Sequence, residues 1–173
     1  IVETMKVLEH AGYHFEAADA SLELLMRAAG GWQQDYFELD SFSVEVGHRS
    51  GSGSRAWNEV AVDVDTEATV RINVGGERRE ATGRGNGPVN ALDSALRQAL
   101  GDSNPGLDRL HLTDFKVRVL ETRKGTGAVT RVLIDTTNGD QTWTTIGVSE
   151  NIIEASWQAL VDSIVYGLLH SED

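Results

Sequence analysis

Apolar side chains recur at helical spacing through the first 30 residues of the chain. The first apolar stripe contains Val2, Met5 and Leu8, and the second, after Gly12, contains Ala18, Leu22, Leu25, Met26 and Ala29. Positions three or four residues apart lie on one face of a helix. The pair Gly30-Gly31 is a helix stop signal. The pattern predicts two short helices joined by a turn.

The rest of the chain contains an internal repeat. Residues 37–46 and 110–119 match at every apolar position with a constant offset of 73. From Phe42 and from Phe115 onward, apolar and polar residues alternate, as expected for a half-buried strand. The repeat therefore predicts two copies of one structural unit.

Each copy continues in the same order. A second alternating strand in each copy ends at a turn, Gly75-Gly76 in the first copy and Asn138-Gly139 in the second, and both pairs are hairpin signals. Third strands are predicted over 78–82 and 141–146. An amphipathic helix follows in each copy, from Pro88 in the first and after Ser149, as N-cap, in the second. Each unit therefore reads strand-strand-strand-helix.

The predicted fold is α+β, with two pseudo-symmetric β-β-β-α units packed together after a short helical linker subdomain. The linker covers 1–34 and the second domain covers 35–173, with repeat 1 at about 35–104 and repeat 2 at about 105–173. A three-stranded sheet with one helix leaves a face bare, so we expect the units to cover each other, within the chain or in a dimer, around a groove for a small ligand. Residues 50–66 form an insertion in the first unit, and 59–64 are expected to add a strand.

Composition excludes several classes of site and partner. The chain has 173 residues, a net charge of −12 and no cysteine, so thiolate metal sites and nucleophilic cysteines are ruled out. Such an acidic surface disfavours nucleic acid, and no apolar run approaches the roughly 20 residues that cross a bilayer. The first residues lack an initiator Met and a signal-peptide layout, so we expect a fragment of a longer cytoplasmic polypeptide.

Candidate chemistry is sparse. His10 and His14 are four residues apart, but Gly12 lies between them in the predicted turn, which favours surface residues over a metal site. No catalytic constellation is evident. For the glycine-bearing loop 82–88, a strand-to-helix turn that needs positive φ is favoured over a phosphate-binding site. A third interpretation is that the free N–H groups at this helix start hold the carboxylate of an amino acid.

Three segments, 85–93, 112–120 and 147–164, resemble the C-terminal regulatory domain of the 2-isopropylmalate synthase family. The stretch 156–160 is closer to the citramalate synthase branch, and 8–25 resemble the helical linker that follows the catalytic barrel in that branch. The resemblance implies a parent enzyme that condenses acetyl-CoA with a 2-oxo acid, pyruvate in this branch, giving (R)-citramalate on a route to isoleucine.

The resemblance also implies partners. The family's catalytic barrel carries a divalent metal, whereas this fragment is expected to hold no cofactor, no metal and no catalytic residue. The domain is expected to form a homodimer and to bind the pathway's end product, isoleucine in this branch and leucine in the other. Neither nucleic acid nor membrane is an expected partner.

The effector pocket carried over by position comprises Val89, Asn90, Leu112, Phe115, Val119, Val129, Ser149 and Asn151. Its apolar residues would enclose a branched side chain, while backbone N–H groups and Ser149 would bind the carboxylate. Asp114 or a loop carbonyl is the expected acceptor for the ammonium group. Residues 50–66 depart from the family pattern. Two alternatives stay open: a dimerisation module without an effector, and a free-standing enzyme on a ferredoxin-like scaffold, which the missing catalytic constellation disfavours.

Overall fold

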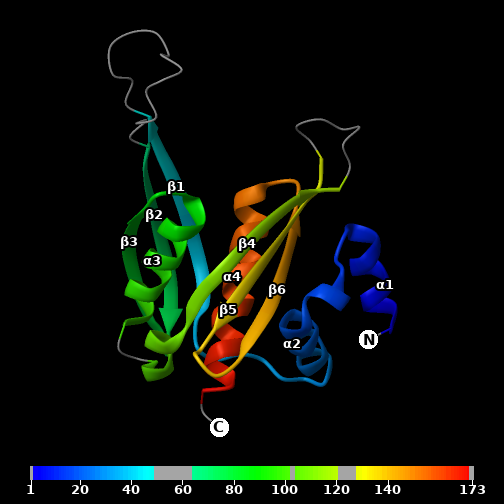
Figure 1. Ribbon diagram of the computed structural model, residues 1–173. Helices are drawn as coiled ribbons and strands as arrows, with labels where there is room; N and C mark the ends of the chain where they lie inside the picture. Colours follow the sequence, from blue (N-terminus) through cyan, green and yellow to red (C-terminus); the bar gives the residue numbers. More distant parts are fainter. Residues whose placement is uncertain (1, 49–63, 102–103, 121–127, 172–173) are drawn as a thin grey trace, which may run out of the picture. The chain divides into compact units, whose positions relative to one another are not determined.

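The structure is a computed structural model that describes residues 2–48, 64–101, 104–120 and 128–171 (Figure 1). The chain forms two compact units: residues 1–34 together with 102–173, and residues 35–101. The strand expected over 59–64 lies outside the described residues, apart from Val64 at the start of a longer strand.

The unit of residues 35–101 is a three-stranded antiparallel sheet with one helix. Its elements are β1 (Glu38–His48), β2 (Val64–Val74), β3 (Glu77–Gly85) and α3 (Pro88–Leu100), with the strands in that order in the sheet. Helix α3 packs over β2 and β3, and buries alternate residues of the central strand, Ala68, Val70 and Ile72. Gly75 and Gly76 both have positive φ, as a tight hairpin turn requires.

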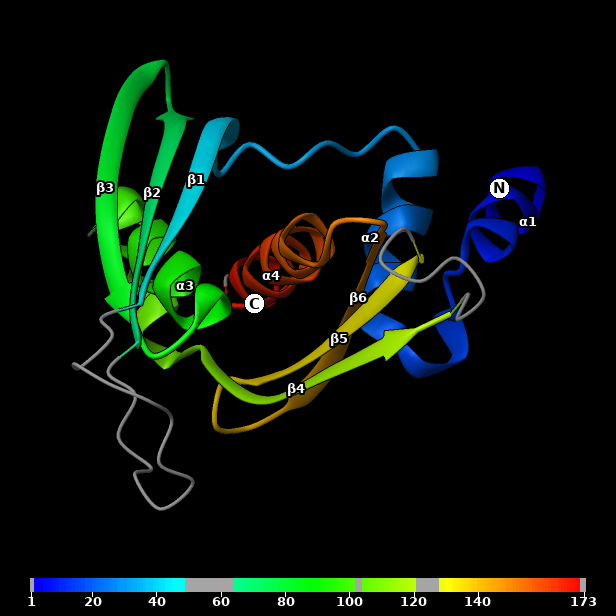
Figure 2. The same cartoon turned by 90° about the horizontal axis from the view of Figure 1, so that it is seen from above.

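The second repeat has the same order, which confirms the predicted β-β-β-α units. A short 3-10 helix, η3 (Pro105–Arg109), leads into β4 (His111–Val119), β5 (Thr130–Thr137), β6 (Thr142–Ser149) and α4 (Ile152–Leu169). Helix α4 packs over β5 and β6 (Figure 2). Both first strands carry a β-bulge at the same repeat position, between Leu39 and Ser41 and between Leu112 and Asp114.

Glycine near the end of each third strand allows the helix to lie close to the sheet. A Cβ on Gly83 would overlap the backbone of α3 at Ala91 and Ala95, and a Cβ on Gly147 would overlap the Ala155 carbonyl oxygen of α4. The expectation of positive φ in the loop 82–88 is wrong, because none of its glycines has positive φ. Close helix approach, not turn geometry, explains Gly83.

The N-terminal segment packs with the second repeat. It forms α1 (Val2–Ala11), η1 (Phe15–Ala17) and α2 (Asp19–Ala29), with Gly12 at φ 113° between the first two elements. Phe15 and Ala18 form a small core with Ile146 of β6. Arg131 of β5 donates to the carbonyl oxygen of Gly12.

Side chains also cover the outer edge of β6. Its N–H groups at residues 144, 146 and 148 donate to Asp19 Oδ1, Ser21 Oγ and Gln158 Oε1, each at 3.0 Å. Unpaired N–H groups on an edge strand invite pairing with another chain. Helices α2 and α4 therefore close this edge of the sheet.

Helix α4 is the one described helix long and apolar enough to cross a membrane, with a mean hydropathy of 1.2. More than half of it, 56%, is buried, and it packs against β5, β6 and α2. Trp157 within α4 is buried, as is Trp143 of β6, whose indole N–H donates to the Ser163 carbonyl oxygen of α4. Its apolar character is accounted for by this core position.

Candidate functional site

The edge strand β4 exposes a row of apolar side chains. Phe115, Val117 and Val119 are 41%, 42% and 49% exposed, whereas Ile134 and Val132, directly opposite the first two on β5, are fully buried. Residues directly opposite in an antiparallel pair lie on the same face. The row therefore lies on the α4 side of the sheet, where α4 covers β5 and β6 but leaves β4 open.

The sequence-predicted residues divide between the two faces of this sheet. Leu112 is paired with buried Thr136, and Ser149 is paired with Thr130, so both share the α4 side with Phe115 and Val119. Val129 is half-buried and points to the opposite face, where its side chain lies close to Gly12. The structure thus brings together the β4 residues but not Val129.

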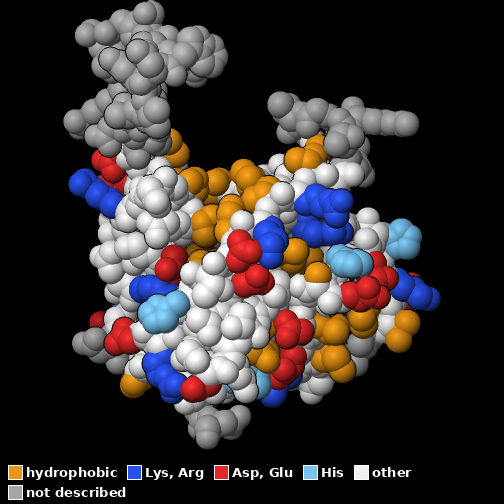
Figure 3. Space-filling model, viewed as in Figure 1, with side chains coloured by type: hydrophobic (Ala, Val, Ile, Leu, Met, Phe, Trp, Pro, Cys, Tyr) orange, Lys and Arg blue, Asp and Glu red, His pale blue; other side chains and the backbone are white. Residues whose placement is uncertain are grey.

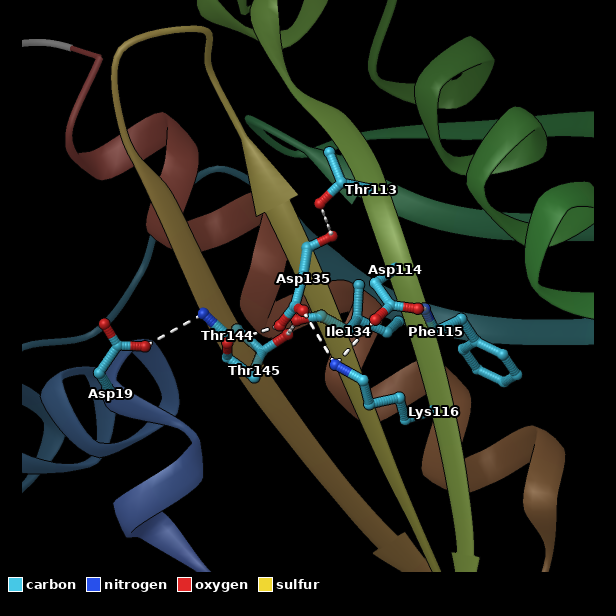
Figure 4. A network of polar contacts seen from close by, with 9 residues as sticks. All are labelled: Asp19, Thr113, Asp114, Phe115, Lys116, Ile134, Asp135, Thr144 and Thr145. Atoms are coloured by element: carbon cyan, nitrogen blue, oxygen red, sulfur yellow. Dashed lines mark hydrogen bonds and ion pairs between the residues drawn. The ribbon is translucent and has the colours of Figure 1, made fainter.

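The other side of β4 is polar. Lys116 Nζ lies 2.7 Å from Asp114 Oδ2 and 3.4 Å from Asp135 Oδ2, and Thr144 donates to Asp135 Oδ1 (Figure 4). Hydrogen bonds from Lys116 and from the Phe115 N–H hold the pKa of Asp114 below its usual value. The ring of Phe115 points away from this cluster (Figure 4). Asp114, the suggested ammonium acceptor, is therefore paired with Lys116 and does not share the face of Phe115.

Acidic and basic side chains are interspersed on the face shown in Figure 3, and hydrophobic side chains reach the surface between them. Among the residues that the structure describes, no group of three or more His, Cys, Asp or Glu side chains is arranged to hold a metal ion.

The start of α4 is capped by its own side chains. Asn151, not Ser149, is the N-cap: its Oδ1 accepts from the N–H groups of Ile153 and Glu154, and Ser149 Oγ accepts from the Asn151 N–H. The predicted cap at Ser149 is wrong because β6 extends through this residue. Both side chains are thus already engaged with orphan N–H groups that an anion would otherwise contact.

The start of α3 differs in this respect. Its N-cap is Gly87, which has no side chain, and no side-chain cap is present. Asn90 is exposed and Val89 is half-buried in the first turn. Helix N-termini with free N–H groups attract anions, so of the two equivalent helix starts this one is better suited to bind a carboxylate.

A buried hydroxyl lies beside the α3 start. Thr66 of β2 is fully buried, and its Oγ1 has no hydrogen-bond partner. Thr66 is directly opposite Gly85, whose missing side chain would run into Asn90 and the Ala91 N–H in the first turn of α3. Sequence reasoning missed Thr66, because a threonine in a strand carries no signal of an unsatisfied hydroxyl. It also missed Val117, although the alternation Phe115, Val117, Val119 indicates a shared face.

The comparisons with known proteins identify the family. A sequence model of the LeuA allosteric (dimerisation) domain matches residues 16–168. An (R)-citramalate synthase of Streptomyces coelicolor is 51% identical over 172 residues, and one of Aquifex aeolicus is 46% identical over 173 residues. The chain covers 30% and 31% of the lengths of these two relatives. A 2-isopropylmalate synthase of Aquifex aeolicus is 31% identical over 105 residues, which are 61% of this chain and 19% of that protein.

These matches confirm the resemblance drawn from the sequence, including its closeness to the citramalate synthase branch. The family match agrees with the observed structure, in which the β-β-β-α order occurs twice and the edge strand β4 exposes apolar side chains. The chain belongs to the LeuA allosteric (dimerisation) domain family, as a regulatory domain of the citramalate synthase type.

Proposed function

We propose that this domain dimerises and senses isoleucine for a citramalate synthase. In that parent enzyme, a catalytic barrel that needs a divalent metal would condense acetyl-CoA with pyruvate to give (R)-citramalate in the cytoplasm. Support comes from the family match and from the names of the most similar relatives. The proposed role of the domain is feedback: isoleucine would bind one arrangement of the dimer better than the other, because only differential affinity shifts such an equilibrium.

The observation that carries the proposal is the exposed apolar row on β4. Phe115, Val117 and Val119 alternate along an edge strand and are each more than two-fifths exposed. Burying such side chains stabilises an interface by about 25 cal/mol per Å² of apolar surface. We propose that a second copy of the chain covers this row and that Leu112, Phe115 and Val119 contact the effector's branched side chain.

The α3 start supports a carboxylate-binding role for Val89 and Asn90. Its N–H groups lack a side-chain cap, and Thr66 Oγ1 is buried beside them without a partner. An unsatisfied buried hydroxyl costs roughly 1–3 kcal/mol. A ligand atom that accepts from this hydroxyl would remove that cost. Ser149 and Asn151 stay in the proposed site as residues carried over by resemblance, and Val129, on the opposite face of the sheet from Phe115, is left out.

Sedimentation velocity tests dimerisation. Phe115→Asp places a carboxylate in the apolar row and should convert dimer to monomer, because a buried unpaired charge is strongly unfavourable. His111→Asp is the matched control: it adds the same group to the same strand, on the exposed polar face. Dissociation in both variants, or in neither, would exclude the β4 row as the interface.

Calorimetric titration with isoleucine, leucine and valine tests the effector. We expect isoleucine to bind tightest, with roughly 10–200-fold discrimination for a repositioned or missing methyl group. Thr66→Val keeps the side-chain shape and removes the hydroxyl, so the free protein should become more stable while isoleucine binding weakens. Leucine binding in place of isoleucine would point to a 2-isopropylmalate synthase-type sensor. No binding of any of the three, with an intact dimer, would leave a purely structural dimerisation module.

A further inference from the structure

A pocket of about 560 Å³ lies within the unit of residues 1–34 and 102–173, away from β4. It is bounded by residues of α1, η1, α2, the segment after α2 and α4. Most of the lining is apolar, including Leu8, Phe15, Leu24, Leu25, Trp32 and Val165. Its size falls within the range of about 300–1,000 Å³ that is usual for small-molecule sites.

Of the described residues that line this pocket, one carries a carboxylate, Asp162 of α4. Its Oδ2 accepts from Ser21 Oγ at 2.6 Å. The Ser21 hydroxyl also accepts from the Ile146 N–H at 3.0 Å, so its own hydrogen is directed to Asp162. This arrangement fixes Oδ2 as an acceptor and holds the carboxylate in place.

Among the described residues, no positively charged side chain is paired with Asp162. The pocket lining contains no Lys, Arg or His, and among the described residues Ser21 is the partner that Asp162 has. The nearby Tyr13 hydroxyl is directed elsewhere, donating to Gln158 Oε1. A fixed acceptor with an unpaired negative charge at the wall of an apolar pocket is the complement of an ammonium group on an apolar body.

We propose that this pocket binds a small apolar primary amine, with the ammonium group paired to Asp162 and the hydrocarbon part against the apolar wall. A free amino acid fits less well, because its carboxylate would meet no cation in the lining and would lie near the like charge of Asp162. The proposed ligand class therefore differs from that of the isoleucine site, and the two sites share no residue.

Three probes that share a phenylethyl body test the charge requirement in the unaltered chain: 2-phenylethylamine, 2-phenylethanol and 3-phenylpropanoate, which carry an ammonium, a hydroxyl and a carboxylate head group. Titrations at pH 7.5 should be followed by calorimetry and by amide chemical shifts. We expect saturable binding of the amine, with shifts at Ile146 and Val161, at least tenfold weaker binding of the alcohol, and no binding of the carboxylate.

Two variants locate the site. Asp162→Asn should weaken amine binding at least tenfold and leave the alcohol unchanged, because the amide keeps the shape and an acceptor for Ser21. Ala28→Trp, at the exposed rim of the pocket, should fill it and abolish binding of both probes. Asp140→Asn, which removes a carboxylate from an exposed turn, should change neither.

The proposal is overturned if the amine and the alcohol bind equally, if Asp162→Asn binds the amine as tightly as the unaltered chain, or if the amine does not saturate at millimolar concentration. Isoleucine titrated into Asp162→Asn should bind as it does to the unaltered chain. That arm separates failure of the amine site from failure of the proposed sensing function.

Discussion

Replacing Asp162 with asparagine is expected to stabilise the fold at neutral pH. Burial raises the pKa of Asp162 from its ordinary 3.8 to about 6, although the hydrogen bond from Ser21 lowers it in part. The folded state therefore binds this proton more tightly than the unfolded state. The resulting penalty is absent well below pH 3.8, grows as the pH rises through about 6, and reaches about 3 kcal/mol above pH 7, at 1.36 kcal/mol per pKa unit.

Urea unfolding between pH 5 and pH 8, followed by tryptophan fluorescence, measures this effect. Trp143 and Trp157 are buried in the same unit as Asp162 and report its unfolding. The free energy of unfolding of Asp162→Asn should exceed that of the unaltered chain by up to about 3 kcal/mol at pH 7.5. The difference should be about half as large at pH 5, where Asp162 is largely protonated in the folded state.

The control for this experiment is Asp140→Asn. Asp140 pairs with Arg109, and both side chains are exposed, so its loss should change the free energy of unfolding by no more than about 0.5 kcal/mol at either pH. A less stable Asp162→Asn at pH 7.5, or a stability gain that does not change with pH, would refute the reasoning.

Three further predictions concern the fold, and each is tested by urea unfolding. Gly147→Ala should cost several kcal/mol or prevent folding, because its Cβ would overlap the backbone of α4. The control Gly87→Ala, with open space around it, should cost far less. Equal costs would refute the argument that α4 approaches the sheet closely at Gly147. Asn151→Ala should cost about 1 kcal/mol through loss of the α4 cap, and no cost would count against the assigned N-cap. Ser21→Ala should cost roughly 1–3 kcal/mol, because the Ile146 N–H loses its acceptor; a neutral result would show that water replaces the hydroxyl.

The repeated β-β-β-α order was predictable because its signals are local. Alternation along each strand, glycine at the hairpins and Pro88 at a helix start all act over a few neighbouring residues. The cap of α4 was not predictable, because Ser149 and Asn151 are both competent N-caps. The choice depends on where β6 ends, which is set by pairing with β5.

The candidate site was predictable only in part. The β4 residues share a face because of strand alternation, but the position of Val129 on the opposite face depends on its backbone pairing with Leu120, just before β5 begins. The pocket around Asp162 left no trace in the sequence. Ser21 and Asp162 are 141 residues apart, and each lies in an amphipathic helix where a polar residue is ordinary.

The unequal edges of the second sheet have a consequence for assembly. Asp19, Ser21 and Gln158 occupy the outward N–H groups of β6, while β4 at the opposite edge pairs only with β5 in the described structure. Such a sheet has one edge strand that can associate and one whose N–H groups are already capped. Once two copies have joined through β4, neither has a second free edge in this sheet to bind a third copy. Association through this sheet would therefore stop at a closed pair and not grow into a fibre.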